Sequence, residues 1–104
     1  MHEGTIDSAG ALLDLFQRRQ RFVLTTHLNP DGDAIGSEIA LAAWLRKRGR
    51  EVRVINHSPL PAVYRFLDPQ GTIAQFEARR DGAAISDADA IYWVESGKLW
   101  RLAK

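Results

Sequence analysis

The sequence predicts an α/β fold in which a parallel sheet carries helices on both faces. Three short runs have the apolar, β-branched and aromatic composition of strands that are covered on both sides: Phe22–Thr26, Val52–Ile55 and Ile91–Val94. A helical pattern separates the first two runs, and a strand, a helix and a strand within about 35 residues form a right-handed parallel unit. The alternation of helices and strands along the chain therefore predicts a parallel sheet.

Length and composition indicate one globular domain. The 104 residues are 45% apolar and 26% charged, and 14 basic residues against 13 acidic ones leave no strong overall field to attract nucleic acid or a membrane. The apolar runs are far shorter than the roughly 20 residues of a membrane span, and Met1–Gly10 lacks the pattern of a secretory signal. Because the chain has no cysteine, disulfides and thiolate metal sites are excluded, and we expect a cytoplasmic protein.

Two helices are predicted on either side of the first strand. Ser8–Gln20 places its apolar side chains on one side, as in a surface helix. The second helix opens at Ala34, and its apolar residues recur at steps of three and four: Ile35, Ile39, Ala42 and Leu45. Lys47 and Arg48 come directly before Gly49, which is typical of a helix whose negative end is met by cations and closed by glycine.

The remaining segments are less regular. Prolines interrupt the stretch between the second and third strands, where we expect a short helical turn over Ala62–Leu67 and an extended segment over Ile73–Phe76. After the third strand, Leu99, Trp100 and Leu102 predict an apolar tail beside a strand with an open edge. Such an edge favours a homodimer or a partner domain.

Polar residues follow each predicted strand. The first strand leads into His27, Asp31 and Asp33, the second into Asn56, His57 and Ser58, and the third into Glu95 and Ser96. Ligands of open parallel sheets bind outside the carboxyl ends of the strands. We therefore expect these three loops to meet at one edge of the sheet and to form the functional site.

The first of these loops allows two interpretations. His27, Asp31 and Asp33 offer one imidazole nitrogen and two carboxylates, a donor set that suits manganese, magnesium, iron or zinc. Alternatively, Pro30 and Gly32 shape a turn, Asp33 caps the helix that starts at Ala34, and His27 only ends a strand. Spacing alone leaves both interpretations open.

The segment Thr26–Ser37, Thr-His-Leu-Asn-Pro-Asp-Gly-Asp-Ala-Ile-Gly-Ser, follows a strand and opens a helix, and it resembles the first motif of the DHH phosphoesterases. It is similar to the RecJ-like exonucleases and to the oligoribonuclease and phosphoadenosine-phosphate phosphatase branch. Gly49–Val54 and Pro61–Leu67 resemble the family's second strand and the segment after it. The resemblance extends from Arg21 to Leu102 and implies a Rossmann-like domain.

The resemblance implies a metal-dependent hydrolase that cleaves phosphoester bonds of short single-stranded nucleic acid or nucleotides. His27, Asp31 and Asp33 match residues that bind a pair of manganese ions in the family. Glu95 stands where the family has an aspartate that bridges the ions, and its side chain is one methylene longer. Asn29 and Ser37 lie close to these positions, and His57 follows the second strand. All three are candidates for substrate contacts, although each also suits an ordinary turn, helix or loop.

The family's Asp-His-His motif and its C-terminal substrate-binding domain find no match in residues 1–104. We therefore expect a single, partial domain that carries the first part of the metal site and is slow or inactive by itself. A longer protein or a second chain would complete it. The alternatives are a non-catalytic module derived from the family, which binds metal, nucleotide or a partner, and a structural remnant in which Asp31 and Asp33 only shape a turn.

Overall fold

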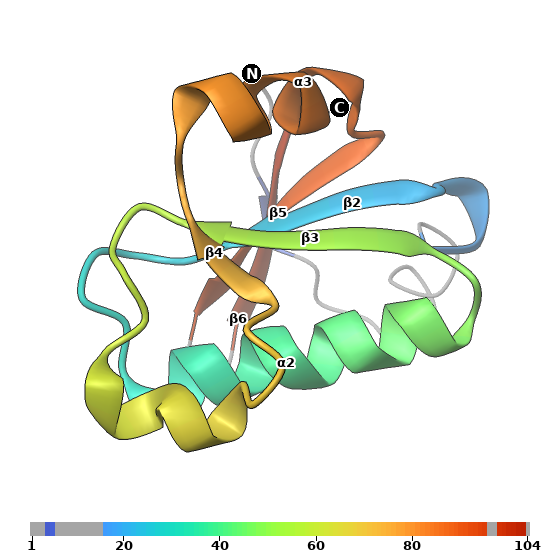
Figure 1. The fold of residues 1–104 in the computed structure, drawn as a ribbon. Coiled ribbons are helices and arrows are strands. Elements are labelled where there is room, and N and C mark those ends of the chain that lie inside the picture. The colour runs from blue at the N-terminus through green and yellow to red at the C-terminus, as the bar shows by residue number, and fades with distance from the viewer. Residues whose placement is uncertain (1–3, 6–15, 96–97, 104) are drawn as a thin grey trace.

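A six-stranded mixed sheet forms the centre of the computed structural model, which describes residues 4–5, 16–95 and 98–103 (Figure 1). The strands are β1 (Gly4–Thr5), β2 (Arg21–Thr25), β3 (Glu51–Asn56), β4 (Ile73–Gln75), β5 (Ala90–Glu95) and β6 (Lys98–Ala103), in the spatial order β1-β6-β5-β2-β3-β4. Four neighbouring strands, β5, β2, β3 and β4, run parallel, and β6 and β1 extend the sheet in antiparallel pairing.

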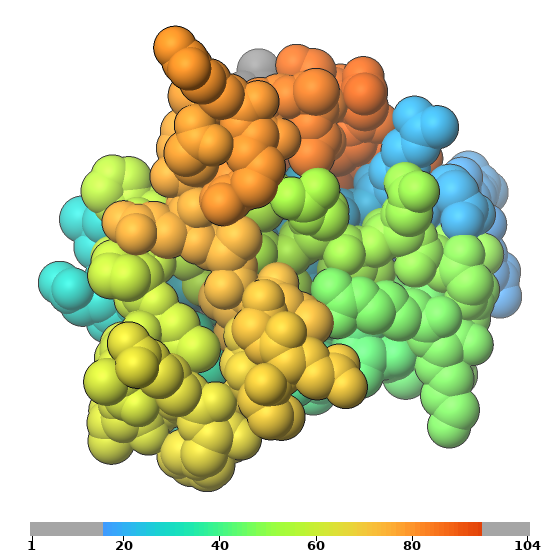
Figure 2. Space-filling model, in the orientation of Figure 1, coloured from blue at the N-terminus to red at the C-terminus, as the bar shows by residue number. Residues whose placement is uncertain are grey.

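Helices cover both faces of this sheet, which confirms the predicted fold class. The long helix α2 (Gly32–Lys47) and the 3-10 helix η1 (Ala62–Leu67) lie on one face, and α3 (Ala78–Asp87) lies on the other (Figure 1). In the space-filling view, the chain around β4 is exposed between α3 and η1 (Figure 2). Among the described helices, none has both the length and the apolar character that crossing a membrane requires.

The central strands are apolar on both faces because each face packs on a helix. On the α2 side, a cluster joins side chains of the sheet to the apolar stripe of α2; its fully buried members include Phe22, Leu24, Leu45, Val54 and Tyr92. On the α3 side, a smaller cluster contains Val23, Ile55, Ile85, Ala88 and Ile91. Burial on two sides explains why these strands appear in the sequence as continuous apolar runs.

The predicted boundaries hold for α2 with one correction. The helix begins at Gly32, and its N-cap is Asp31, whose side chain accepts a hydrogen bond from the Ala34 amide. The prediction that Asp33 caps a helix starting at Ala34 was therefore wrong by one half-turn. At the other end Gly49 has a φ of 77°, the left-handed conformation expected of a glycine that closes a helix.

The first predicted helix, Ser8–Gln20, lies mostly outside the described residues. Its last part, residues 16–18, is helical, and the side chain of Phe16 is buried against the α2-side cluster. The ring of Phe16 meets those of Phe22 and Tyr92 edge to face, with centroids 5.6 and 5.7 Å apart. This contact fits the predicted apolar side of a surface helix.

Helix α3 was not predicted; Ile85 is its only large apolar side chain, and its other apolar residues are alanines. Glu77 caps it by accepting hydrogen bonds from the amides of Arg79 and Arg80. The buried carboxylate of Asp81 accepts hydrogen bonds from the Glu77 amide at 2.9 Å and from the guanidinium of Arg53 on β3 at 3.1 Å. A buried carboxylate as the anchor of a helix is passed over by a search for apolar side chains at helical spacing.

The expected apolar tail is a strand. Residues 98–103 form β6, which pairs antiparallel with β5 between Glu95↔Lys98 and Ile91↔Ala103. The prediction that the third strand has an open edge was therefore wrong, because β5 has β2 on one side and β6 on the other. Backbone groups at a strand edge need hydrogen-bond partners, and the following segment of the same chain supplies them.

We expect Leu24→Ala to lower the free energy of unfolding by about 2 to 5 kcal/mol, since Leu24 is fully buried in the central strand and truncation leaves a cavity. Leu28→Ala is the matched control, because Leu28 is 59% exposed in the loop that follows β2. Urea unfolding of both variants measures the difference. Equal losses in the two variants would contradict the assignment of β2 to the centre of the core.

Candidate metal site at the carboxyl edge of the sheet

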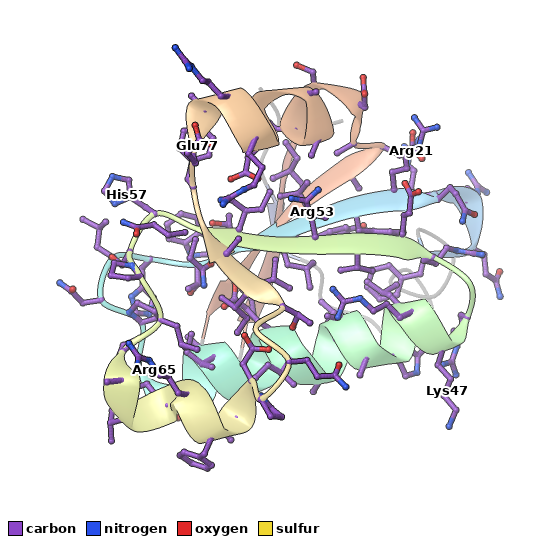
Figure 3. All side chains as sticks on the ribbon, viewed as in Figure 1. Arg21, Lys47, Arg53, His57, Arg65 and Glu77 are labelled. Carbon is purple, nitrogen blue, oxygen red and sulfur yellow. The ribbon has the colours of Figure 1, made fainter. Side chains whose placement is uncertain are left out.

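The loops that follow β2 and β3 meet at one edge of the sheet, as predicted. Both β3 and β5 pair in parallel with β2, so all three strands end on the same side. The Asn29 amide donates a hydrogen bond to Ser58 Oγ at 3.0 Å, and the Thr26 hydroxyl donates to the carbonyl of Val94 on β5. Figure 3 shows His57 at this edge and Lys47, in the last turn of α2, far from it.

The loop between β2 and α2 bends at Asn29. Asn29 adopts a φ of 51°, a left-handed conformation that asparagine tolerates better than most residues, and Pro30 after it is buried. Gly32 lies against the ring of Tyr64 from η1, where a Cβ atom would stand 3.2 Å from Tyr64 Cε1. Glycine at this position therefore lets η1 pack onto the start of α2.

The two aspartates of the loop lie at the amino end of α2. Asp31 is exposed and its Oδ1 accepts a hydrogen bond from the Ala34 amide at 2.8 Å, while Asp33 is exposed in the first turn. The amino end of a helix carries a partial positive charge that favours carboxylates and phosphate groups. Both carboxylates therefore remain accessible to a ligand in a region that also favours anions.

The ring of His27 is oriented by its own loop. Its Nδ1 lies 2.9 Å from the carbonyl oxygen of Leu28, which can only accept a hydrogen bond, so Nδ1 carries the proton. When the ring is neutral, the lone pair is then on Nε2, the other nitrogen of this half-buried ring. A histidine that binds metal commonly donates its second nitrogen to a carbonyl in this way, so the tautomer suits a metal ligand.

Behind the loop lies a buried polar pair that sequence reasoning missed. Glu38 of α2 and Asn56, the last residue of β3, are 0% and 1% exposed, and Asn56 Nδ2 donates a hydrogen bond to Glu38 Oε1 at 2.9 Å. Burial raises the pKa of Glu38 to about 7, although the hydrogen bond from Asn56 and the nearby His27 act in the opposite direction. This carboxyl group therefore changes its charge near neutral pH.

The position of Glu38 could have been noticed in the sequence. The buried residues of α2 are Ala34, Ile35, Glu38, Ala42 and Leu45, a stripe at helical spacing with one charged member. The sequence interpretation placed Ile39 on that stripe, yet Ile39 is only half-buried. A carboxylate on an apolar stripe is expensive to bury, so its presence there is a signal of function or of a specific partner.

The other candidate residues are spread around the edge. Ser37 is half-buried in α2, and exposed His57 lines an apolar cavity of about 190 Å³ on the α3 side together with Phe76 and Ile91. Glu95 is the last residue of β5, as its predicted position at the strand end requires, but its side chain and Ser96 lie outside the described residues.

The described residues contain no group of three or more histidine, aspartate or glutamate side chains placed to hold one ion. Asp31 is engaged as a helix cap, His27 is turned toward Leu28, and the Glu95 side chain is not described. The donor types and the His27 tautomer fit a divalent metal. The ligand set of His27, Asp31, Asp33 and Glu95 therefore stays a prediction.

A cavity of about 430 Å³ lies at the opposite edge, beside the amino ends of β2 and β3. It is bordered by Arg21 and Arg53, which Figure 3 shows away from His57. None of the described residues lining it belongs to the loop that joins β2 to α2. The residues predicted from the sequence to form the site lie at the carboxyl edge and do not line this cavity.

Comparison with known proteins gives a likeness among solved structures. No family model matches the chain, and no curated protein matches it. Among solved structures, the chain is similar to an exopolyphosphatase-related protein from Bacteroides fragilis, with 28% sequence identity and a TM-score of 0.69. The match covers 79% of this chain and 25% of that protein, so this chain corresponds to about a quarter of its length.

We expect Asp31→Ala to lower the free energy of unfolding by about 1 kcal/mol, because the Ala34 amide loses its cap. Asp31→Asn is the matched variant: its side-chain oxygen keeps the cap and loses only the charge. Thermal or urea unfolding of the two variants separates capping from charge. A stability loss in Asp31→Asn as large as that in Asp31→Ala would contradict the capping role.

The raised pKa of Glu38 predicts a pH dependence of stability. Between its ordinary value of 4.5 and about 7, the folded protein holds a proton that the unfolded chain has released. The contribution of Glu38 is therefore full below pH 4.5, falls as the pH rises to 7, and totals roughly 3 kcal/mol. The difference in unfolding free energy between Glu38→Gln and the wild type should grow by that amount over this range, and a difference that stays constant would refute the burial of this carboxyl group.

Proposed function

We propose that this chain is a phosphoesterase-type domain that hydrolyses phosphoester bonds with the help of divalent metal, most simply manganese. The proposal is carried by the loop from His27 to Asp33, which presents an imidazole and two carboxylates at the carboxyl edge of a parallel sheet and at the amino end of α2. The likeness to an exopolyphosphatase-related protein supports the same reaction class. Three donors in one loop are the donor set of such a metal site.

In this proposal His27 uses Nε2 as a ligand, and Asp31 uses the carboxylate oxygen that does not cap the helix. Asp33, and Glu95 at the end of β5, would supply further carboxylate ligands to the metal. A bound pair of divalent ions activates a water molecule and neutralises charge on the phosphoryl oxygens. The positive end of α2 attracts the phosphate, and Asn29, Ser37 and His57 orient the substrate.

The four ligands proposed are too few for two ions, each of which takes about six donors when bound to oxygen-rich sites. The remaining donors come from water, substrate and further protein side chains. We propose that those side chains belong to another part of a longer protein or to a second copy of this chain. The match to only 25% of the exopolyphosphatase-related protein supports this view, and we expect the 104 residues by themselves to be slow or inactive.

The proposed substrates are short single-stranded nucleic acids or nucleotides. The chain has a net charge of +1, so attraction of a polyanion must come from the site and not from the whole surface. Metal ions and the amino end of α2 supply that local positive charge. Such a site acts on a terminal or short phosphoester that can enter the edge of the sheet.

A second candidate is a non-catalytic module that binds metal, nucleotide or a partner. It is favoured by one observation: Asp31 Oδ1 is already engaged as the helix cap, and the described acidic and histidine side chains do not converge on one point. The experiment below distinguishes this candidate from a phosphoesterase half-site, because only the latter couples metal binding to phosphoester hydrolysis.

We expect titration calorimetry to detect manganese binding by the wild-type chain and a loss of about 100-fold or more in affinity in Asp31→Asn, Asp33→Asn, since even residues behind the ligands are worth 10- to 100-fold. The asparagine at position 31 preserves the helix cap, so unfolding curves should change little. The matched control is Glu51→Gln, Asp87→Asn, which removes two exposed carboxylates beside the cavity at the opposite edge.

The control variant should bind manganese as the wild type does. Identical flat traces for all three proteins would reject the metal site in this chain. Metal binding without any hydrolysis of a phosphodiester by the longer protein that contains this chain would favour the non-catalytic module.

A further inference from the structure

On the face of the sheet that packs on α2, the buried side chains change from apolar to polar toward the carboxyl ends of the strands. Two successive levels are apolar: Phe22 pairs with Val52 and Ala90, and Leu24 pairs with Val54 and Tyr92. Two residues further along, Thr26 and Asn56 are buried and polar, and Glu38 of α2 contacts this level through its hydrogen bond to Asn56. Thr26, Asn56 and Glu38 therefore form a polar layer beside the buried, apolar Val94, at the end of the core nearest the loop that contains His27, Asp31 and Asp33.

This layer is expensive for the fold. Besides the hydrogen bond between them, Glu38 Oε2 and Asn56 Oδ1 are buried and have no hydrogen-bond partner among the described residues. Buried acceptors without partners lose the hydrogen bonds that water would give them. An apolar residue at position 38 would continue the stripe of α2 at no such cost, so packing alone does not explain a glutamate there.

Glu38 and Asn56 are connected to the loop between β2 and α2 through neighbouring residues of the chain and through hydrogen bonds. Asn56 is followed by His57 and then by Ser58, whose hydroxyl accepts the hydrogen bond of the Asn29 amide at 3.0 Å. Asn29 is two residues before Asp31, which caps α2, and α2 carries Glu38. The connections form a closed ring from α2 through the end of β3 and the loop back to α2.

This ring includes Asn29, the residue of the loop with a positive φ. Asn29 has its φ at 51°, and its amide is held by Ser58 from the neighbouring strand end. If the end of β3 moves relative to α2, Ser58 moves with it and the Asn29 peptide loses its partner. Metal ligands tolerate displacements of only about 0.2 Å, so a small shift of this peptide changes the geometry of His27 and Asp31.

We infer that Glu38 is a positioning residue of the carboxyl-edge site: through Asn56 it locks the end of β3 to α2, and through Ser58 it sets the backbone of the loop from His27 to Asp33. The inference deepens the proposed function and rests on it only where metal affinity is measured. The ring itself consists of protein contacts, so it can be tested without metal.

The test compares Glu38→Met with Glu38→Gln. Methionine fills a similar volume without accepting a hydrogen bond, whereas glutamine keeps an oxygen for Asn56 Nδ2. We expect Glu38→Met to speed hydrogen exchange of the Asn29 amide by about tenfold or more and to weaken manganese binding by about tenfold, the lower end of the effect of residues behind metal ligands. Glu38→Gln should stay close to the wild type in both measurements.

Asp81→Asn is the matched control, because Asp81 is equally buried and hydrogen-bonded but lies in α3 on the other face of the sheet. It should lower stability without changing Asn29 exchange relative to global unfolding. Ser58→Ala removes the last step of the ring from a half-buried position that does not threaten folding, and it should speed Asn29 exchange as Glu38→Met does.

Unchanged Asn29 exchange in Ser58→Ala, or in a folded Glu38→Met, would overturn the inference and leave Glu38 as a costly core residue. If the wild-type chain binds no manganese, the proposed function fails, yet the exchange measurements still decide whether Glu38 positions the loop. The two failures are therefore distinguishable.

Discussion

The parallel pairing of β2 with β3 and β5 is the constraint on which the rest of this structure depends. Parallel neighbours cannot be joined by tight turns, so the chain must cross over a face of the sheet between them. These crossovers bury both faces and send the strand ends to one edge. The same pairing that buries Leu24 and Val54 therefore brings the loop after β2 beside Ser58 and Val94.

At that edge, buried polar groups lower the stability of the fold and link α2 to the strand ends through hydrogen bonds. The core there contains a polar layer of Thr26, Glu38 and Asn56, where two oxygens are buried without partners among the described residues. A carboxyl group whose pKa burial raises to about 7 weakens the fold at neutral pH. The layer links α2 to the ends of the central strands through directional hydrogen bonds, which fix geometry more closely than apolar contacts do.

The amino end of α2 combines two tasks. Asp31 satisfies the Ala34 amide and thereby starts the helix, and the helix in turn holds Asp31 and Asp33 where its positive end favours anions. The turn interpretation and the metal interpretation of this loop are therefore compatible, because one carboxylate oxygen is enough for the cap.

The sequence predicted the parallel α/β class, the central strands, most of α2 and the loop that carries His27, Asp31 and Asp33, because periodicity, capping and turn residues are local properties. It missed α3, whose anchor is the polar contact of Asp81 with Arg53, and it misassigned β6, whose pairing with β5 needs the assembled sheet. The tertiary structure was needed to place Glu38 against Asn56, since the two residues are 18 positions apart and meet only through folding. The cap of α2 by Asp31 is a local contact with the Ala34 amide, which the sequence analysis assigned to Asp33 instead. Burial and hydrogen bonding between distant residues are properties of the folded chain, and no pattern within a short window of sequence contains them.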